Sequence, residues 1–461
     1  MSTHVAMALC ESYSMLPNFT GHWKANLSKC EFRSGPVPKE IFVDIDHAGE
    51  DLRAAMVVTT DSTKEERVAF ECRTDGTAGR STMNGRPIRG RSSWVNDELV
   101  IESWITSGER ELYFRDCWSI SADGRILRME HRDDALAGQL AVLDRVEYDP
   151  FAPGMFDVNT LTIEAFDDVR NRRFPCEIWY PWLARFRKCP LVVYSHPSTG
   201  KRRSASFLCT HLSSHGYVVA AMDHSEVVDP DGFARKENET EEQTLARMNL
   251  WIMNRVPDAR LLLDHLLTRW ESDVQLDAGR VGIVGHSFGG WTALAATEVD
   301  WRIRAVVALA PGGASNPKPG ILPLKLAFRW GRDVPALYLV AENDTALPLS
   351  GMQELYERTP ATKQMFVLRN ADHMHFMDNV EEQHERIRAM SLPGKAAAIA
   401  QEMRPIAELA SGEQGHTFVR ALTLSHMDAV LRQNPAARDI LSGNVESILK
   451  QHGVEVTTHS C

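Results

Sequence analysis

The pattern of apolar and polar positions changes near residue 150 of the chain. Before that point, short runs alternate apolar and polar side chains between turn dipeptides, as antiparallel strands with one buried face do. No run there fits a helix longer than two turns, so this part of the chain is predicted to form a closed barrel or a sandwich. The expected strands are residues 41–45, 52–58, 67–72, 99–105, 112–120 and 126–129, with turns at 75–76, 96–97, 107–108 and 123–124.

Residues 149–154 contain two prolines and a glycine and read as a linker. After them, short continuous apolar runs alternate with helical segments, which is the pattern of a doubly wound α/β sheet. We expect a pair of edge strands at 160–164 and 176–181, followed by buried strands at 191–194, 217–222, 281–284, 303–310, 336–341 and 365–368. In such a sheet the loops that carry chemistry lie at the carboxyl ends of the strands.

One strand-to-helix junction carries the strongest chemical signal. The strand at 281–284 runs into Gly285-His286-Ser287-Phe288-Gly289-Gly290, which has the Gly-x-Ser-x-Gly spacing of a nucleophile elbow. The direct turn from strand to helix strains the serine backbone, and a Cβ two residues before or after it would collide with neighbouring backbone. Ser287 is therefore the predicted nucleophile. The alternative is a glycine-rich turn with an inert serine.

A serine hydroxyl needs a base and an acid that orients the base, in the chain order serine, acid, histidine for this kind of sheet. Asp344 lies in the loop after the strand at 336–341 and is the predicted acid. Glu342 is the second choice, but it sits so close to the strand that it is better suited to bracing the loop. After the last strand, His373 is the predicted base and His375 its competitor. A His-x-His metal site is a weaker interpretation, because no further ligands stand at metal spacing nearby.

The oxyanion of an acyl-transfer reaction needs backbone N–H donors. Phe288, directly after the nucleophile, supplies one. The other is expected from the loop after the strand at 191–194, where Pro197 has no N–H, so Ser198 or else Thr199 is the donor. His196 is expected to brace this loop, and His224 is interpreted as an ordinary loop-end residue.

Composition sets outer limits on function. Hydrophobic residues make up 43% of the 461 residues and charged residues 25%, as in soluble globular proteins. The net charge of −11, without a long basic run, argues against nucleic acid or an anionic membrane as a partner. No apolar stretch approaches a membrane span, and residues 1–15 lack the features of a signal peptide. The eight cysteines show no Cys-x-x-Cys spacing, which favours reduced thiols in a cytoplasmic protein.

Two resemblances extend this interpretation. Gly21-His22-Trp23 resembles the Gly-x-Trp that opens lipocalin-type barrels, and Arg145, on the presumed last strand of the first region, resembles the arginine that packs over that tryptophan. The simpler interpretation of this region is a β domain that packs on the neighbouring domain or forms a dimer contact. The alternative is a barrel that holds an apolar ligand or helps to deliver one.

The second region resembles the bacterial platelet-activating-factor acetylhydrolase-like and dienelactone-hydrolase-like esterases. The likeness covers roughly residues 160–380 and is carried by the segments 195–196, 215–219, 223–224 and 285–290. It implies an α/β-hydrolase that cleaves carboxylic esters through an acyl-enzyme, with no metal or organic cofactor. Two departures matter: Pro197 replaces the usual glycine, and the strand at 303–310 ends without the acid that the acetylhydrolases proper carry there.

The predicted fold is therefore a lipocalin-like all-β barrel followed by a doubly wound α/β-hydrolase sheet. Its predicted segments are a tail (1–18), the barrel (19–148), a linker (149–156), the catalytic domain (157–380) and a helical extension that completes it (381–461). The segment 311–330 is expected to line a substrate pocket or to pack structurally. The helical extension is expected to cover the site or to make a contact in a homo-oligomer. The expected substrate is a small-molecule ester, and thioester, lactone or peptide hydrolysis and non-catalytic ligand binding are the alternatives.

Overall fold

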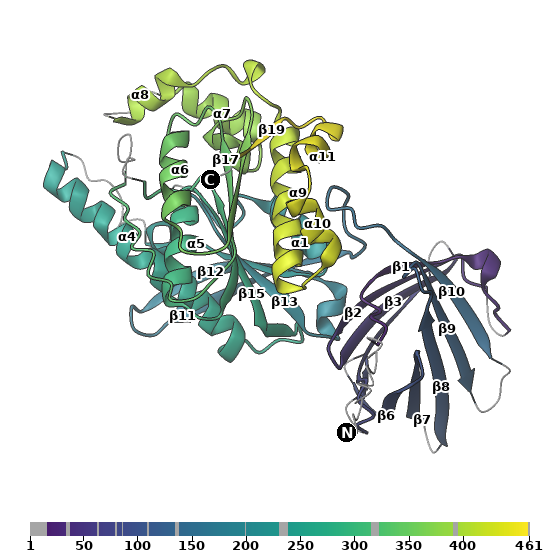
Figure 1. The fold of residues 1–461 in the computed structure, drawn as a ribbon. Coiled ribbons are helices and arrows are strands. Elements are labelled where there is room, and N and C mark those ends of the chain that lie inside the picture. The colour runs from purple at the N-terminus through teal and green to yellow at the C-terminus, as the bar shows by residue number, and fades with distance from the viewer. Residues whose placement is uncertain are drawn as a thin grey trace, which may run out of the picture. The chain divides into compact units, whose positions relative to one another are not determined.

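The structure is a computed structural model of the chain. It describes residues 16–33, 37–61, 64–78, 81–84, 86–107, 110–133, 138–198, 200–229, 238–314, 322–390 and 395–459. The chain divides into two compact units, Met1–Glu147 and Tyr148–Cys461 (Figure 1). The predicted alternative donor Thr199, the tail 1–15 and part of the segment 311–330 lie outside the described residues.

The first unit is a closed antiparallel barrel, which confirms the predicted all-β class. The strands follow the order β1-β10-β9-β8-β7-β6-β5-β4-β3-β2, with β1 closing the ring between β10 and β2. Their bounds are β1 Gly21–Ala25, β2 Glu40–Ala48, β3 Asp51–Asp61, β4 Lys64–Arg73, β5 Ser81–Met83, β6 Arg86–Val95, β7 Glu98–Ser107, β8 Arg110–Ile120, β9 Ile126–Asp133 and β10 Gln139–Arg145, with a 3-10 turn at Leu27–Lys29.

The strands expected from the alternation do not include β1, β5, β6 or β10, and β10 was expected only as the last strand, which carries Arg145. β6 contains Pro87 and Gly90 and has little apolar alternation, so it gives a weak strand signal. The glycine is required by close packing, because a Cβ at Gly90 would lie 2.6 Å from the hydroxyl of Ser81. Tertiary packing therefore selects the strand here against its local preference.

The lipocalin-like signature is present as predicted. Trp23 pairs with Arg145 across β1 and β10, and the guanidinium carbon of Arg145 lies 4.2 Å from the centre of the Trp23 ring. Arg145 also donates to the backbone carbonyls of Thr20 and Gly124, at 2.8 and 2.7 Å. A fully buried Trp23 and Phe19 belong to the apolar barrel core that these contacts seal.

The second unit contains a sheet in the order β11-β12-β14-β13-β15-β16-β17-β18-β19. The strands from β14 to β18 are parallel, which confirms the predicted α/β-hydrolase class, whereas β12 and β19 pair antiparallel to their neighbours. Their bounds are β11 Val158–Asp167, β12 Arg172–Pro181, β13 Cys189–Ser195, β14 Val218–Met222, β15 Leu276–His286, β16 Ile303–Leu309, β17 Ala336–Ala341, β18 Lys363–Leu368 and β19 Val456–His459.

The expectation of two edge strands was half wrong. β11 lies at the edge, but β12 pairs on both sides, with β11 and β14. Its burial pattern, almost continuous from Cys176 to Pro181, is that of an inner strand.

Helices cover both faces of the sheet (Figure 1). α4 and α5 pack on one face, and α1 and α9 on the other. The helices are α1 Ser206–Ser214, α2 Ser225–Val228, α4 Glu241–Asp264, α5 Phe288–Val299, α6 Leu349–Arg358, α7 Val380–Arg388, α8 Lys395–Glu402, α9 Gly412–Leu431, α10 Pro435–Ser442 and α11 Val445–Gln451, with a π-helical turn at His265–Arg269 and short 3-10 turns at Trp182–Arg185, His373–Phe376 and Ile406–Glu408.

One helix of the C-terminal extension, α9, belongs to the hydrophobic core and does not simply cover the site. α9 buries Phe418, Leu422 and Met427 almost completely against the sheet. A Cβ at Gly282 of β15 would lie 2.6 Å from the Met427 sulfur, so this helix lies directly on the nucleophile strand. The expectation that the extension covers the site or contacts another subunit therefore does not describe α9.

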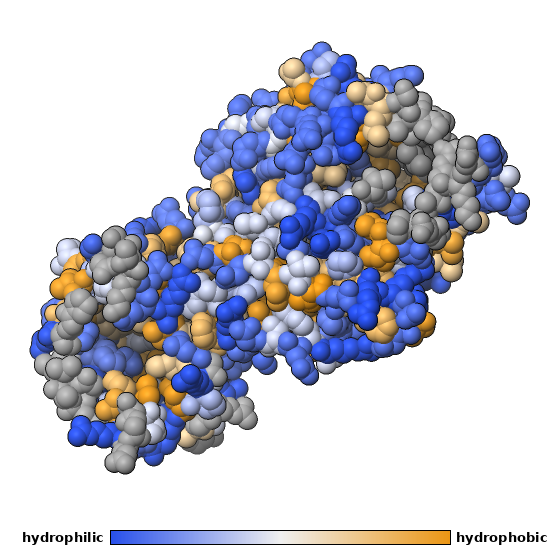
Figure 2. Space-filling view, turned by 180° about the vertical axis from the view of Figure 1, so that it is seen from behind, coloured by the Kyte–Doolittle hydropathy of each residue, from blue (hydrophilic) through white to orange (hydrophobic). Residues whose placement is uncertain are grey.

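The surface is largely hydrophilic on one face of the molecule (Figure 2). On the face shown in Figure 2, hydrophilic residues cover most of the surface and hydrophobic residues occur in small groups between them. Within the described ranges, none of the helices combines the length and the apolar character that crossing a membrane requires.

Candidate active site

Ser287 occupies the strained turn between β15 and α5. Its backbone has φ 59° and ψ −115°, a conformation that non-glycine residues rarely adopt. The turn is held by hydrogen bonds from the Ser287 N–H to Leu309 O at 2.9 Å and from the Gly312 N–H to Ser287 O at 3.0 Å. Ser287 as a whole residue is 8% exposed and so counts as buried.

The glycines around Ser287 are required by close backbone contacts. A Cβ at Gly285 would lie 2.0 Å from the carbonyl oxygen of Gly289, and a Cβ at Gly289 would lie 1.9 Å from that of Ser195. Such distances force backbone movement, because no flexible side chain can yield. The start of α5 is therefore seated directly on the end of β13.

The structure brings Ser287, His373 and Asp344 together. The hydroxyl of Ser287 lies 2.9 Å from Nε2 of His373, and Nδ1 of His373 lies 2.6 Å from Oδ2 of Asp344. Because a carboxylate only accepts, Nδ1 carries the proton and Nε2 is free to accept from the serine. The other Asp344 oxygen accepts from the Leu347 N–H at 2.7 Å, which fixes the carboxylate in its loop.

The surroundings favour a positive charge on His373. Burial alone lowers its pKa, but the charge of Asp344 and its hydrogen bond outweigh burial and raise the pKa above the usual histidine value. The ring of His286 lies beside it, with centroids 4.7 Å apart. Burial and the nearby His373 hold the pKa of His286 well below its usual value, so His286 is a neutral packing partner.

His375 has a different role from His373. Its Nδ1 lies 2.9 Å from Asp372, its Nε2 lies 2.8 Å from the carbonyl of Ala410, and its side chain is fully buried. Asp372 also pairs with Nδ1 of His384 at 2.7 Å. These contacts tie the loop that carries His373 to α7 and to the start of α9, and the two imidazoles of the His-x-His sequence do not share a target. Among the described residues, no group of three or more His, Cys, Asp or Glu side chains is arranged to hold a metal ion.

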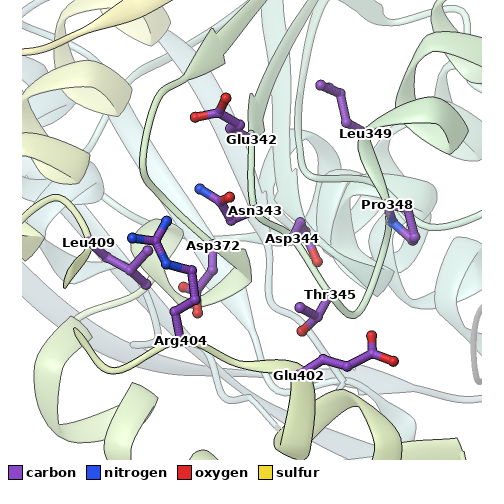
Figure 3. Close-up of a pocket in the computed structure, with 10 residues that line it drawn as sticks. All are labelled: Glu342, Asn343, Asp344, Thr345, Pro348, Leu349, Asp372, Glu402, Arg404 and Leu409. Atoms are coloured by element: carbon purple, nitrogen blue, oxygen red, sulfur yellow. The ribbon is translucent and has the colours of Figure 1, made fainter. Parts of the chain in front are cut away.

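Glu342 braces the loop, as its position predicted. Its carboxylate accepts from the Asn370 N–H at 2.9 Å and pairs with Arg369 at 2.7 Å. A cavity of about 300 Å³ is lined by Glu342 and by Asp344, the predicted acid. Figure 3 shows Asp344 and Asp372 at its wall, with Arg404 and Glu402 contributed by the C-terminal extension.

The segments of the two predicted oxyanion donors also come together. Phe288 is the first residue of α5, where an N–H has no carbonyl one turn earlier to bond. Ser198 follows β13, whose last residue Ser195 lies against Gly289. His196 braces this loop as expected, because its Nδ1 lies 2.7 Å from Pro197 O and its Nε2 accepts from the His224 N–H at 3.2 Å.

A second serine, histidine and aspartate set, which the sequence analysis did not identify, lies beneath this loop. The hydroxyl of Ser195 lies 2.9 Å from Nε2 of His224, and Nδ1 of His224 lies 3.3 Å from Asp258. All three residues are at most 1% exposed. His224 is therefore more than a loop-end residue. No sequence motif identifies this second set. Asp258 lies within α4, whereas the acid of a hydrolase triad is expected in a loop at the end of a strand.

Comparisons with known proteins find several to which this chain is similar. A sequence model of the family described as "Platelet-activating factor acetylhydrolase, isoform II" matches residues 168–261. Cutinase est1 of Thermobifida alba is 27% identical over 41% of this chain and 54% of its own length. A bis(hydroxyethyl) terephthalate hydrolase of Streptomyces coelicolor is 26% identical over 44% of this chain and 55% of its own. A platelet-activating factor acetylhydrolase of Canis lupus familiaris is 24% identical over 43% and 50%.

A solved structure of a ferulic acid esterase from Streptomyces cinnamoneus aligns with 67% of this chain and 98% of its own, at a TM-score of 0.49 and 23% identity. The matches to the cutinase, the terephthalate hydrolase and the acetylhydrolase span about half the length of those relatives. The likeness to esterases of the acetylhydrolase group, expected from the motifs, is thus found independently by sequence comparison.

Proposed function

We propose that this chain, an α/β-hydrolase similar to the platelet-activating factor acetylhydrolases and the cutinases, is a serine esterase that cleaves small carboxylic esters. The observation that carries the proposal is the hydrogen-bonded chain from Ser287 through His373 to Asp344, with the serine at a strained elbow. The names of the relatives support ester hydrolysis as the reaction class.

In the proposed reaction, His373 takes the proton of Ser287 as the hydroxyl attacks the ester carbonyl. Asp344 orients the imidazole and stabilises the imidazolium that forms. The amides of Phe288 and Ser198 hold the oxyanion. His373 then gives its proton to the leaving alcohol, and a water molecule, activated in the same way, releases the acid from the acyl-enzyme.

No step of this sequence calls for a metal or an organic cofactor. The proposed partner is a small-molecule ester, and a cytoplasmic location and the absence of a nucleic-acid partner stay predictions. Ligand binding by the barrel stays a prediction as well. The same machinery serves thioesterases, lactonases and peptidases, so the ester must be tested against those substrates.

Labelling with a fluorophosphonate tests the proposal directly, because the reagent bonds only to an activated serine. The wild-type chain and the Ser195→Ala variant are expected to be labelled, whereas Ser287→Ala is not. A folded wild-type protein that takes no label would contradict the proposal and favour a non-catalytic binding protein.

Matched substrates then define the class. p-Nitrophenyl acetate, the corresponding thioester and the corresponding anilide differ only in the leaving group, and the ester is expected to have the highest kcat/KM. Bis(hydroxyethyl) terephthalate and platelet-activating factor extend the test to the compounds that appear in the names of the relatives. Faster hydrolysis of the thioester or the anilide would reassign the reaction.

A further inference from the structure

Arg255 is a fully buried cation that contacts both segments of the proposed oxyanion hole. It lies in α4 and is 0% exposed. Its Nη1 donates to His196 O at 2.6 Å and its Nη2 to Pro197 O at 3.2 Å. Its guanidinium carbon also lies 4.1 Å from the centre of the Phe288 ring.

We infer that Arg255 is the positioning residue of the oxyanion hole, which holds the Ser198 and Phe288 amides in register with each other. The inference rests on the proposed function, because it assigns a role within that site. Arg255 touches neither the substrate nor the triad in this arrangement and acts through the two donor segments.

Peptide geometry explains how a distant side chain can aim the Ser198 amide. The carbonyl of Pro197 and the N–H of Ser198 belong to one planar trans peptide and point in opposite directions. Because Arg255 holds the Pro197 oxygen, the Ser198 N–H is turned to the side away from the guanidinium. A hydrogen bond to the carbonyl also polarises the peptide and makes its N–H a better donor.

The second donor is held through its side chain. The guanidinium lies over the Phe288 ring within the distance of a cation–π interaction, which is strongest where both groups are desolvated. Phe288 is only 2% exposed, so its ring has little freedom to leave this contact. Arg255 therefore links α5, which carries one amide, to the loop after β13, which carries the other.

The charge of Arg255 also suits a developing oxyanion. Burial lowers the pKa of Arg255, but Glu226 and Asp258 act against this, and an arginine remains protonated at neutral pH. Glu226 pairs with Nη2 and compensates part of the charge. His196 and His224, which face the same guanidinium, have lowered pKa values and stay neutral. A fixed positive group in a site with little water stabilises negative charge without having to reorganise.

Replacement of Arg255 by Met in the full chain tests the inference. Loss of one oxyanion donor lowers kcat by on the order of 100-fold in other hydrolases, and a similar loss is expected here with KM changed by less than about threefold. Arg255→Lys keeps a charge but lacks the fork that reaches both carbonyls, so a smaller loss of about tenfold in kcat is expected.

A matched control exists on the same helix. Arg247 is also a buried arginine, paired with Glu239 at 3.0 Å and lying over the ring of Trp251 at 5.0 Å. Arg247→Met is expected to leave kcat within about twofold of wild type, since the lost ion pair touches no donor segment. Circular dichroism and thermal unfolding verify that each variant is folded.

Inhibitor binding distinguishes a loss of oxyanion-donor orientation from a general distortion of the site. Phenylboronic acid forms a tetrahedral adduct with the serine and loads the oxyanion hole, whereas a benzamide analogue of the substrate does not. Arg255→Lys and Arg255→Met are expected to lose boronate affinity in proportion to kcat and to keep amide affinity. If Arg255→Met does not fold, Arg255→Lys and Glu226→Gln carry the comparison, with the glutamine variant expected within about threefold of wild-type kcat because both carbonyl contacts remain.

The outcomes are distinct. Folded Arg255 variants with wild-type kcat and boronate affinity would overturn this inference while leaving the esterase intact. Equal losses of boronate and amide affinity would also overturn it, because they indicate a collapsed site. A wild-type chain that cleaves no ester would remove the proposed function itself.

Discussion

Two serine, histidine and aspartate sets lie in the same unit, and we propose that only one of them is catalytic. Ser287, His373 and Asp344 are joined at 2.9 and 2.6 Å, and the buried set of Ser195, His224 and Asp258 at 2.9 and 3.3 Å. Connectivity is the same in both, from serine to Nε2 and from Nδ1 to carboxylate. The three side chains alone therefore do not distinguish a reactive set from a structural one.

The surroundings make the difference. Ser287 stands in a strained turn at the start of a helix, whereas Ser195 ends an ordinary strand and is fully buried. The pKa of His373 is raised, mainly by Asp344 against the effect of burial. The pKa of His224 is lowered, first by burial and then by the charge of Arg255. A base must become an imidazolium during acyl transfer, so the environment of His224 opposes the step that the environment of His373 favours.

Asp258 also accepts several hydrogen bonds from residues outside its serine and histidine set. It accepts from Arg170 at 2.5 Å, from the Ser225 hydroxyl at 2.9 Å and from the Ser225 N–H at 2.8 Å. The buried set thus anchors the loop after β14 to α4. It lies next to the loop of Ser198, the proposed oxyanion donor, because Ser195 is the last residue of β13 and that loop follows it directly.

The largest contrast is expected between the two serines. Ser287→Ala removes the proposed nucleophile and is expected to lower kcat by on the order of 10⁶-fold, as such a change does in serine hydrolases. Ser195→Ala removes one buried hydroxyl and is expected to keep kcat within about tenfold, with a loss of about 1–3 kcal/mol in the free energy of unfolding. Initial rates with p-nitrophenyl acetate and urea unfolding measure both. Equal loss of activity in the two variants would abolish the distinction drawn here.

The two aspartates are expected to separate activity from stability. Asp344→Asn offers the wrong partner to the imidazole and is expected to lower kcat by on the order of 10⁴-fold. Asp258→Asn weakens a buried charge network that includes Arg170 and is expected to lower the free energy of unfolding by about 3–5 kcal/mol. Steady-state kinetics and urea titration of both variants test this. A stable, inactive Asp258→Asn protein would assign chemistry to the buried set.

The backbone of the elbow is the third difference. Gly289→Ala places a methyl group 1.9 Å from the Ser195 carbonyl and must shift the nucleophile, so a loss in kcat of about 10²-fold is expected. Gly279→Ala, at the other end of β15, meets only the side chain of Asp277, at 3.3 Å, and serves as the control. The alanine at 279 should change kcat little. Comparable rates for both variants would show that the elbow tolerates a side chain.

The smallest effect concerns pH. Only neutral His373 can accept the serine proton, so kcat/KM is expected to rise with pH through an apparent pKa above the usual histidine value of 6.5. Because the carboxylate of Asp344 raises this pKa, Asp344→Asn is expected to move the rising limb to lower pH. His224→Gln should leave the apparent pKa of the rising limb of kcat/KM unchanged. A pH–rate profile that shifts with His224 instead would identify that residue as the titrating base.

Local chemistry made much of the fold and the site predictable. The alternating strands and the change of pattern near residue 150 express preferences that a short segment carries by itself. The Trp23–Arg145 pair joins distant parts of the chain and was expected only from the resemblance to lipocalin-type barrels. The fold class was confirmed, while β1, β5, β6 and β19 were missed because each is short or lacks apolar alternation. The choice of Ser287 followed from glycine spacing, whose cause is a backbone collision between near neighbours.

The chain by itself determined where a nucleophile, an acid and a base could stand, because these positions follow from motif spacing and strand ends. Only the tertiary structure showed that His373, and not His375, contacts Ser287 and Asp344. It alone also showed that α9 belongs to the core and revealed the set around Asp258. Those outcomes depend on contacts between residues far apart in the chain, such as Arg255 with Pro197 and His375 with Ala410. Burial and charge at such contacts arise only when the segments meet, so no local pattern records them.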